Sequence, residues 1–223
     1  MSYAVAIPAY NAAETLSEAL HSVLSQTVPP AEVVVLDDGS TDETSAIASQ
    51  FGGVVRVLRT ENRGCGAAAT KAIRATTCSI IATLDADDLW LPEKMALQLA
   101  ALGEARDPTL IFSRIRQFRH GTSDDGTGEE RDGLIRSTLV MHRAHFEQVG
   151  DIVDPPGGCG EMIDWLARAR AAGHRFTMIP RVLALRRIIE TSLTYRMDAE
   201  RKRGVLAVAH RALQRKRTGG PPA

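Results

Sequence analysis

The sequence predicts a single α/β domain built on a mostly parallel central sheet that is flanked by helices. The first observation is that short apolar runs of strand length alternate with amphipathic runs of helical length through the N-terminal half. This alternation is typical of βαβ units, whose strands are parallel and buried on both faces. The second observation is composition: 223 residues, of which 44% are apolar and 24% charged, fit one globular domain.

The N-terminal half gives the clearest element predictions. Buried strands are expected at residues 4–7, 33–36, 54–58 and 80–84. Helices are expected between them, at residues 13–25, 42–50 and 66–75. Polar clusters directly follow three of these strands, at residues 8–11, 37–40 and 85–88. Because ligands on parallel sheets bind outside the carboxyl ends of the strands, we expect the three clusters to face one crevice.

The C-terminal half alternates less regularly. We expect a helix that begins at Pro92, where proline suits the first turn, and a mobile loop at residues 120–133, which are rich in Gly, Asp, Glu and Thr. Further strands are expected at residues 110–112, 134–141, 175–179 and 182–186. Further helices are expected at residues 142–149 and 160–172, followed by a basic helical tail at residues 195–217.

Charge and cysteine usage exclude some classes of protein. Lys plus Arg equal Asp plus Glu at 27 each, and the three cysteines form no CxxC pair, so neither a disulfide framework nor a zinc site is expected. The basic tail has no interleaved aromatic residues, so nucleic acid is not an expected partner. The tail is expected to pack on the domain, with an anionic membrane surface or an acidic partner as alternatives. Without a signal peptide or an apolar run of about 18 residues, we expect a cytoplasmic protein, with peripheral contact at the inner face of a membrane as the alternative.

The cluster at residues 85–88 carries the sharpest chemical signal. Asp85, Asp87 and Asp88 place three carboxylates within four residues, where they repel one another. A hard divalent cation such as Mn²⁺ or Mg²⁺ removes this repulsion and also bridges phosphate oxygens. The alternative is a turn or capping role before the helix that follows.

The other clusters contain groups suited to a nucleotide. A carboxylate of Asp37 or Asp38 is placed to accept a hydrogen bond from the imide of a pyrimidine base, and Tyr10 to stack on that base. The alternative for the aspartates is ordinary turn and cap chemistry. Asn62 and Lys71 lie where a diphosphate would need polar or positive groups, although Lys71 also fits a solvated helix position.

The ordered set of motifs resembles family-two glycosyltransferases. The matching runs, in chain order, are VAIPAYN (5–11), LSQT (24–27), VLDDGSTD (35–42), ENRG (61–64), TLDADD (83–88) and VMHRAHFEQVG (140–150). Residues 179–186 resemble the closing segment of the family. The resemblance implies the glycosyltransferase A fold and a nucleotide-diphosphate sugar donor, with a UDP-sugar expected first. It also divides the domain into a donor half at residues 1–105 and an acceptor-side half at 106–192, followed by the basic tail at 193–223.

The resemblance further implies roles for individual residues. Asp87 would hold Mn²⁺ or Mg²⁺ on the diphosphate. The donor-binding set comprises Pro8, Tyr10, Asn11, Asp37, Asp38, Asn62, Lys71, Asp85 and Ala86. The acceptor is expected to be a glycan, a lipid-linked glycan, a peptide or a small molecule.

The expected reaction is a single displacement with inversion, in which a carboxylate removes the acceptor proton. The family usually supplies this base as the Asp of a Glu-Asp pair, but Met162 occupies that position here. Glu161 is therefore the first candidate and Asp164, one turn along the helix, the second. Alternatively, Glu161 only complements the helix dipole, or the acceptor brings a thiol that needs less help.

Two other functions fit parts of the pattern. A non-catalytic nucleotide-sugar binding or scaffold protein of the same fold is favoured by Met162. A nucleotidyltransferase would use a similar metal and nucleotide crevice, but would be expected to carry a glycine-rich, basic phosphate loop near its first strand. Residues 8–11 do not form such a loop.

Overall fold

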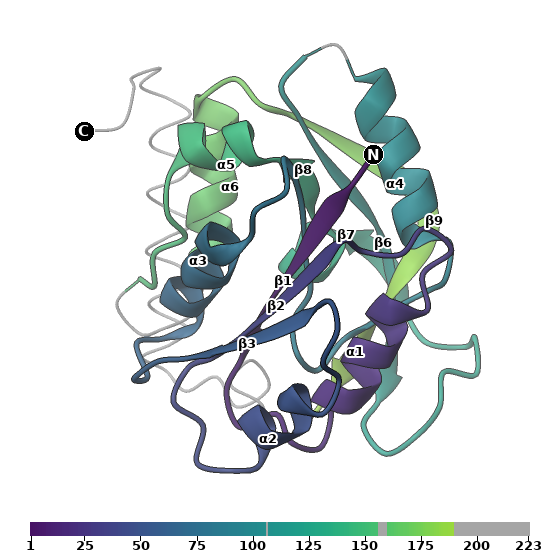
Figure 1. Ribbon diagram of the computed structural model, residues 1–223. Helices are drawn as coiled ribbons and strands as arrows, with labels where there is room; N and C mark the ends of the chain where they lie inside the picture. Colours follow the sequence, from purple (N-terminus) through teal and green to yellow (C-terminus); the bar gives the residue numbers. More distant parts are fainter. Residues whose placement is uncertain (106, 156–159, 190–223) are drawn as a thin grey trace.

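The computed structural model describes residues 1–105, 107–155 and 160–189, which form one twisted sheet covered by helices on both faces (Figure 1). The strand order is β3-β2-β1-β4-β8-β6-β9-β5, and β7 pairs with β6 outside this path. Helices α1, α2 and α4 pack on one face, and α3, α5 and α6 on the other. The predicted α/β domain with a mostly parallel sheet is confirmed, because the long ladders are parallel and the antiparallel ones are short.

The N-terminal half follows the predicted alternation closely. Its parallel strands are β1 (Tyr3–Ala9), β2 (Glu32–Asp37), β3 (Val55–Arg59) and β4 (Ile80–Thr83). The connecting helices are α1 (Leu16–Leu24), α2 (Thr44–Ser49) and α3 (Cys65–Ala75). All residues of β1 are buried, as expected for a central parallel strand covered on both faces. The carboxyl ends of β1, β2 and β4 therefore meet at one edge of the sheet, as the polar clusters predict.

The second half extends the sheet beyond β4. Its elements are β5 (Leu89–Trp90), α4 (Lys94–Glu104), β6 (Thr109–Arg119), β7 (Glu130–Gly133), the 3₁₀ turn η1 (Arg136–Thr138), β8 (Val140–His142), α5 (Arg143–Val149), α6 (Glu161–Ala171) and β9 (Arg175–Ile188). Strand β8 lies antiparallel between β4 and β6 and so joins the two halves into one sheet.

Three element predictions in this half are wrong. Residues 134–141 are not one strand, because the polar side chains of Arg136, Ser137 and Thr138 turn inward in the 3₁₀ turn and leave only β8 in the ladder. The expected loop at residues 120–133 ends in strand β7, which pairs with β6. The two short strands around Pro180 are a single strand, β9.

A bulge explains how β9 passes its proline. Ile179 pairs with Ser113 and Val182 with Arg114, so Pro180 and Arg181 are skipped in the ladder. Proline has no N–H to donate, and a bulge is one of the places where a strand tolerates it. The same pattern read from sequence alone looks like a break between two strands.

The basic tail at residues 193–223 lies outside the described residues. Among the residues that are described, no helix is both long and apolar enough to cross a membrane.

Candidate functional site

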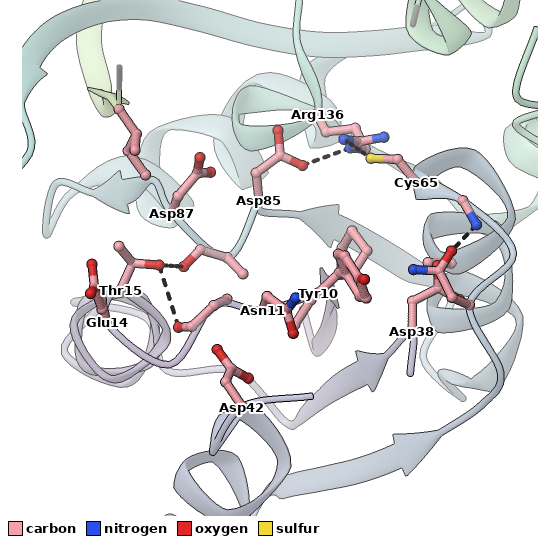
Figure 2. Close-up of a pocket in the computed structure, with 18 residues that line it drawn as sticks. Tyr10, Asn11, Glu14, Thr15, Asp38, Asp42, Cys65, Asp85, Asp87 and Arg136 are labelled. Carbon is pink, nitrogen blue, oxygen red and sulfur yellow. Dashed lines mark hydrogen bonds and ion pairs between the residues drawn. The ribbon is translucent and has the colours of Figure 1, made fainter. Parts of the chain in front are cut away.

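A cavity of about 790 Å³ opens where the carboxyl ends of β1, β2 and β4 meet (Figure 2). Its walls come from the segment after β1, the loops after β2, β3 and β4, and the start of α3. Arg136 from η1 and Ile189 after β9 complete the lining that the structure describes. The volume lies within the range of about 300–1,000 Å³ that is usual for small-molecule sites.

Most of the sequence-predicted donor residues line this cavity. They are Pro8, Tyr10, Asn11, Asp38, Asn62, Asp85 and Ala86, together with the predicted metal ligand Asp87. The Tyr10 side chain remains half exposed at the cavity, where a flat ring is available for stacking.

Two predicted donor residues lie elsewhere. Asp37 is fully buried and accepts hydrogen bonds from the Ser40 backbone N–H, at 2.8 Å, and from the Ser45 hydroxyl. Its carboxylate therefore holds the turn together and does not line the cavity. Lys71 lines a separate groove of about 450 Å³ between α3 and residues 151–154, because its position on α3 directs it away from the cavity.

The loop after β2 is held by hydrogen bonds within the protein. Asp38 accepts the backbone N–H groups of Arg63 at 3.0 Å and Gly64 at 2.9 Å, which fixes the loop that enters α3. Gly39 has a φ of +78°, and a Cβ there would lie 2.8 Å from the Asn62 nitrogen, so only glycine allows these two loops to approach. Asp38 thus lines the cavity and also holds the loop that enters α3.

The N-terminus of α3 is already occupied. Asp154 accepts the backbone N–H groups of Gly66 at 2.8 Å and Ala67 at 3.0 Å. A helix N-terminus is otherwise a favourable place for phosphate. Because Asp154 accepts from these N–H groups, they are not available to a bound anion.

The loop after β4 has more carboxylate oxygens than hydrogen-bond donors to pair with them. Asp88 is buried and accepts from the Ser137 hydroxyl and from the Arg187 backbone N–H at 3.0 Å. Burial and the nearby carboxylates of Asp87 and Asp85 raise the pKa of Asp88 well above its ordinary value. Burial and the Asp85 carboxylate raise the pKa of Asp87 to about 6. None of the ion pairs between described residues involves Asp87.

The cavity as a whole is strongly acidic. Five carboxylates line it, those of Glu14, Asp38, Asp42, Asp85 and Asp87. Against them, Arg136 is the single lysine, arginine or histidine among the described lining residues.

The carboxylates that line the cavity suit a hard cation that takes few protein ligands. No group of three or more His, Cys, Asp or Glu side chains in the described part of the chain is arranged to hold a metal ion alone. Mg²⁺ typically takes one or two carboxylates and completes its shell with substrate phosphates and water. Oxygen ligands at Asp87 beside Asp85 suit that type of binding.

Arg136 is one of the lining residues that the sequence did not predict, together with Glu14, Asp42 and Cys65. Its side chain is 7% exposed, and it donates to Asp85 through Nε at 2.7 Å and to Glu161 through Nη1 at 3.0 Å. Figure 2 shows it reaching Asp85 and Cys65, whose Sγ lies 2.8 Å from Nη2. The available signal was a lone arginine inside the apolar run at residues 134–141.

The two predicted catalytic residues sit differently on α6. Glu161 does not line the cavity but contacts Arg136, which does. Asp164 forms an ion pair with Arg168 at 2.9 Å and lies away from the cavity. Met162, at the position where a base was expected, packs against the core.

The mixed α/β sheet with its cavity at the strand ends matches the glycosyltransferase A fold. The S. aureus TarS crystal structure in complex with UDP matches 96% of this chain and 71% of that chain with a TM-score of 0.70 and 19% identity. The complex of TarS with UDP-GlcNAc matches 89% of this chain and 62% of that chain, also with a TM-score of 0.70 and 19% identity. The chain belongs to glycosyl transferase family 2, whose model matches residues 4–160.

Curated relatives agree with this family. The succinoglycan biosynthesis protein ExoU of Rhizobium meliloti is 31% identical over 203 residues, which cover 78% of this chain and 58% of ExoU. TuaG of Bacillus subtilis, named for teichuronic acid biosynthesis, is 35% identical over 168 residues, covering 68% of this chain and 65% of TuaG. An uncharacterized glycosyltransferase of Rickettsia bellii is 37% identical over 110 residues, 48% of this chain and 16% of that protein. The chain thus spans less than two thirds of each of these relatives.

Proposed function

We propose that the protein is a metal-dependent glycosyltransferase that moves a sugar from a nucleoside diphosphate sugar to an acceptor with inversion. The observation that carries this proposal is the charge of the cavity, where five carboxylates face one guanidinium among the described lining residues. A nucleoside diphosphate is itself an anion, so it needs a cation in this cavity to offset the repulsion. Family membership supplies the reaction class.

The donor-binding roles follow from the lining. Asp87, beside Asp85, would hold Mn²⁺ or Mg²⁺ together with the diphosphate. When bound, this ion offsets the charge that develops on the departing nucleoside diphosphate. Tyr10 provides a ring for the base to stack on, and Asp38 borders the same end of the cavity. Since TarS was crystallised with UDP and with UDP-GlcNAc, a UDP-sugar is the donor to test first.

The acceptor side requires a base. Inversion by single displacement needs a group that removes the acceptor proton on the face opposite the leaving group. Glu161 is proposed for this role because its carboxylate adjoins the cavity wall through Arg136 at 3.0 Å. Asp164 is held by Arg168 and is left out of the proposal. The names of ExoU and TuaG make a growing polysaccharide the acceptor to test first.

A binding protein without transferase activity is the second candidate. Met162 favours it, because a thioether packed against the core cannot accept the acceptor proton. Such a protein would bind the nucleotide sugar and leave it intact. Slow release of the nucleotide from the donor therefore separates the two functions.

The direct test is nucleotide release from a panel of UDP-, GDP- and TDP-sugars by the full chain. We expect release from one donor class, dependent on Mn²⁺ and stopped by EDTA. Asp87→Asn should stop it, and Glu161→Gln should lower turnover while UDP binding is kept. Asp125→Asn, at an exposed aspartate outside the cavity, is the matched control. Release that continues unchanged in EDTA would refute the metal dependence.

A further inference from the structure

Arg136 joins the donor cavity to the first turn of α6. We propose that it is a positioning residue, which holds Glu161 in a fixed position relative to Asp85. It thereby couples the donor site to the acceptor-side base. This inference rests on the proposed function, because it assumes that Glu161 acts on the acceptor. It goes beyond that function by assigning a role to a side chain that carries no chemistry of its own.

The guanidinium of Arg136 connects three elements of the fold. Each guanidinium nitrogen of Arg136 meets a different element: Nε the loop after β4, Nη1 the start of α6, and Nη2 the start of α3. A guanidinium is planar and rigid, so two of its bonds fix the relative positions of Asp85 and Glu161. These residues are far apart in sequence, and the described structure shows no direct bond between them.

Arg136 and Glu161 form an ion pair that is mostly buried. The Arg136 side chain is 7% exposed, and the Glu161 side chain is 13% exposed. Removing the guanidinium would leave two carboxylates close together in a mostly buried place, and unpaired buried charges are strongly unfavourable. A lysine keeps the charge but lacks the fork, so it is not expected to hold both carboxylates at once.

The contact with Cys65 is the weakest of the three that Arg136 makes. Nη2 donates to Cys65 Sγ, and sulfur is a poor hydrogen-bond acceptor. Burial raises the pKa of this thiol to about 12, although Arg136 opposes the shift, so the thiol stays protonated at neutral pH. Both residues line the cavity, so this nitrogen is the part of Arg136 that a bound donor can engage without disturbing Glu161.

The first arm of the test uses thermal unfolding of the ligand-free full chain. In the wild type, E161Q should lower the melting temperature, because it removes the partner of a buried cation. In the R136M background, E161Q should raise it, because it removes an unpaired buried carboxylate. If E161Q changed the melting temperature in the same direction in both backgrounds, the inference would be overturned, whatever the activity of the protein.

The second arm uses Mn²⁺-dependent UDP release from the UDP-sugar that the wild type turns over. R136M should lower kcat by about 10- to 100-fold, as loss of a supporting residue usually does. In the E161Q background, R136M should lower kcat by less than about threefold, since Arg136 acts through Glu161. If the double variant instead lost kcat by the product of the two single losses, Arg136 would act independently of Glu161, and the inference would be overturned.

Two further variants separate positioning from a general loss of structure. R136K should fold and bind UDP with Mn²⁺ but recover only part of kcat. R143K is the matched control, because Arg143 also makes part-buried hydrogen bonds, to the carbonyls of Thr76 and Cys78, but lies outside the cavity. It should leave kcat unchanged. A wild type that releases no nucleotide would instead refute the proposed function, which the melting experiment does not depend on.

Discussion

Two aspartate-rich loops lie at the same edge of the sheet and behave in opposite ways. The loop after β2 begins with Asp37 and Asp38, and the loop after β4 contains Asp85, Asp87 and Asp88. In the first, backbone amides and hydroxyls donate to the carboxylates. Burial alone would raise the pKa of Asp37, but hydrogen bonds from Ser40 and Ser45 hold it below the ordinary value. In the second loop, burial and mutual repulsion raise the pKa of Asp87 to about 6.

The difference lies in the donors and not in the residue type. Where the protein supplies enough N–H and O–H groups, a cluster of carboxylates stabilises a turn. Where it supplies too few, the charge is left for an external cation to offset. The first loop therefore supports the shape of the cavity, and the second is proposed to supply its chemistry.

The largest expected effect follows from removing the carboxylate in the second loop. Asp87→Asn should lower Mn²⁺-dependent nucleotide release by more than about 100-fold, beyond the loss typical of residues that only support a ligand. Asp37→Asn should leave release per folded molecule within about threefold. Steady-state assays on both variants, corrected for folded fraction, make the comparison. Equal losses in the two variants would remove the distinction between the loops.

The next effect is on stability, in the first loop. Asp37→Asn should lower the free energy of unfolding by about 2–3 kcal/mol, because hydrogen bonds to a charged acceptor contribute about that much. Urea unfolding at neutral pH measures it. The pKa of Asp37 is lowered in the folded state, so its contribution is present above the ordinary carboxyl range and is lost as the pH falls. The variant and the wild type should therefore converge in acid.

The second loop should respond with the opposite sign. Without metal at pH 7.5, Asp87→Asn should raise the free energy of unfolding by about 3 kcal/mol, since it removes a buried repelling charge. A carboxyl whose folded-state pKa is about 6 stabilises the protein at low pH and loses that contribution as the pH rises through 6. The gain in the variant should therefore vanish below about pH 4. Urea unfolding in EDTA across this range checks the sign.

The smallest effect concerns one hydroxyl. Ser45→Ala removes a single donor to Asp37 and leaves the Ser40 backbone N–H in place. We expect a loss of about 1 kcal/mol in urea unfolding and no change in nucleotide release. A loss as large as that of Asp37→Asn would mean that the hydroxyl, and not the backbone, holds the turn.

The sequence predicted the N-terminal half better than the C-terminal half for a physical reason. Strands β1, β2 and β4 are buried on both faces and read as continuous apolar runs, and the polar clusters at their ends are short and local. Strand β9 contains Pro180, whose bulge is visible only against β6. The sequence pattern of β9 is interrupted at Pro180, so the sequence alone could not show that the two parts form one strand.

Site residues could be predicted from the sequence where their position relative to a strand end brings them to the cavity. They could not be predicted where contacts between distant segments do so. Tyr10 directly follows β1, Asp87 lies in the loop after β4, and both line the cavity. Asp37 and Asp38 are adjacent in sequence, but strand alternation turns one into the core and the other toward the cavity. Arg136 contacts residues that are distant in sequence, so its role appears only in the folded chain.

The most direct test of the central claim is the melting temperature of the wild type and Asp87→Asn, titrated with UDP in the presence and absence of Mn²⁺. Binding to the native state raises the melting temperature by mass action. We predict that UDP raises it in the wild type only when Mn²⁺ is present, and that Asp87→Asn does not respond. An equal rise with UDP alone, or an unchanged response in Asp87→Asn, would contradict a cation-dependent donor site at this loop.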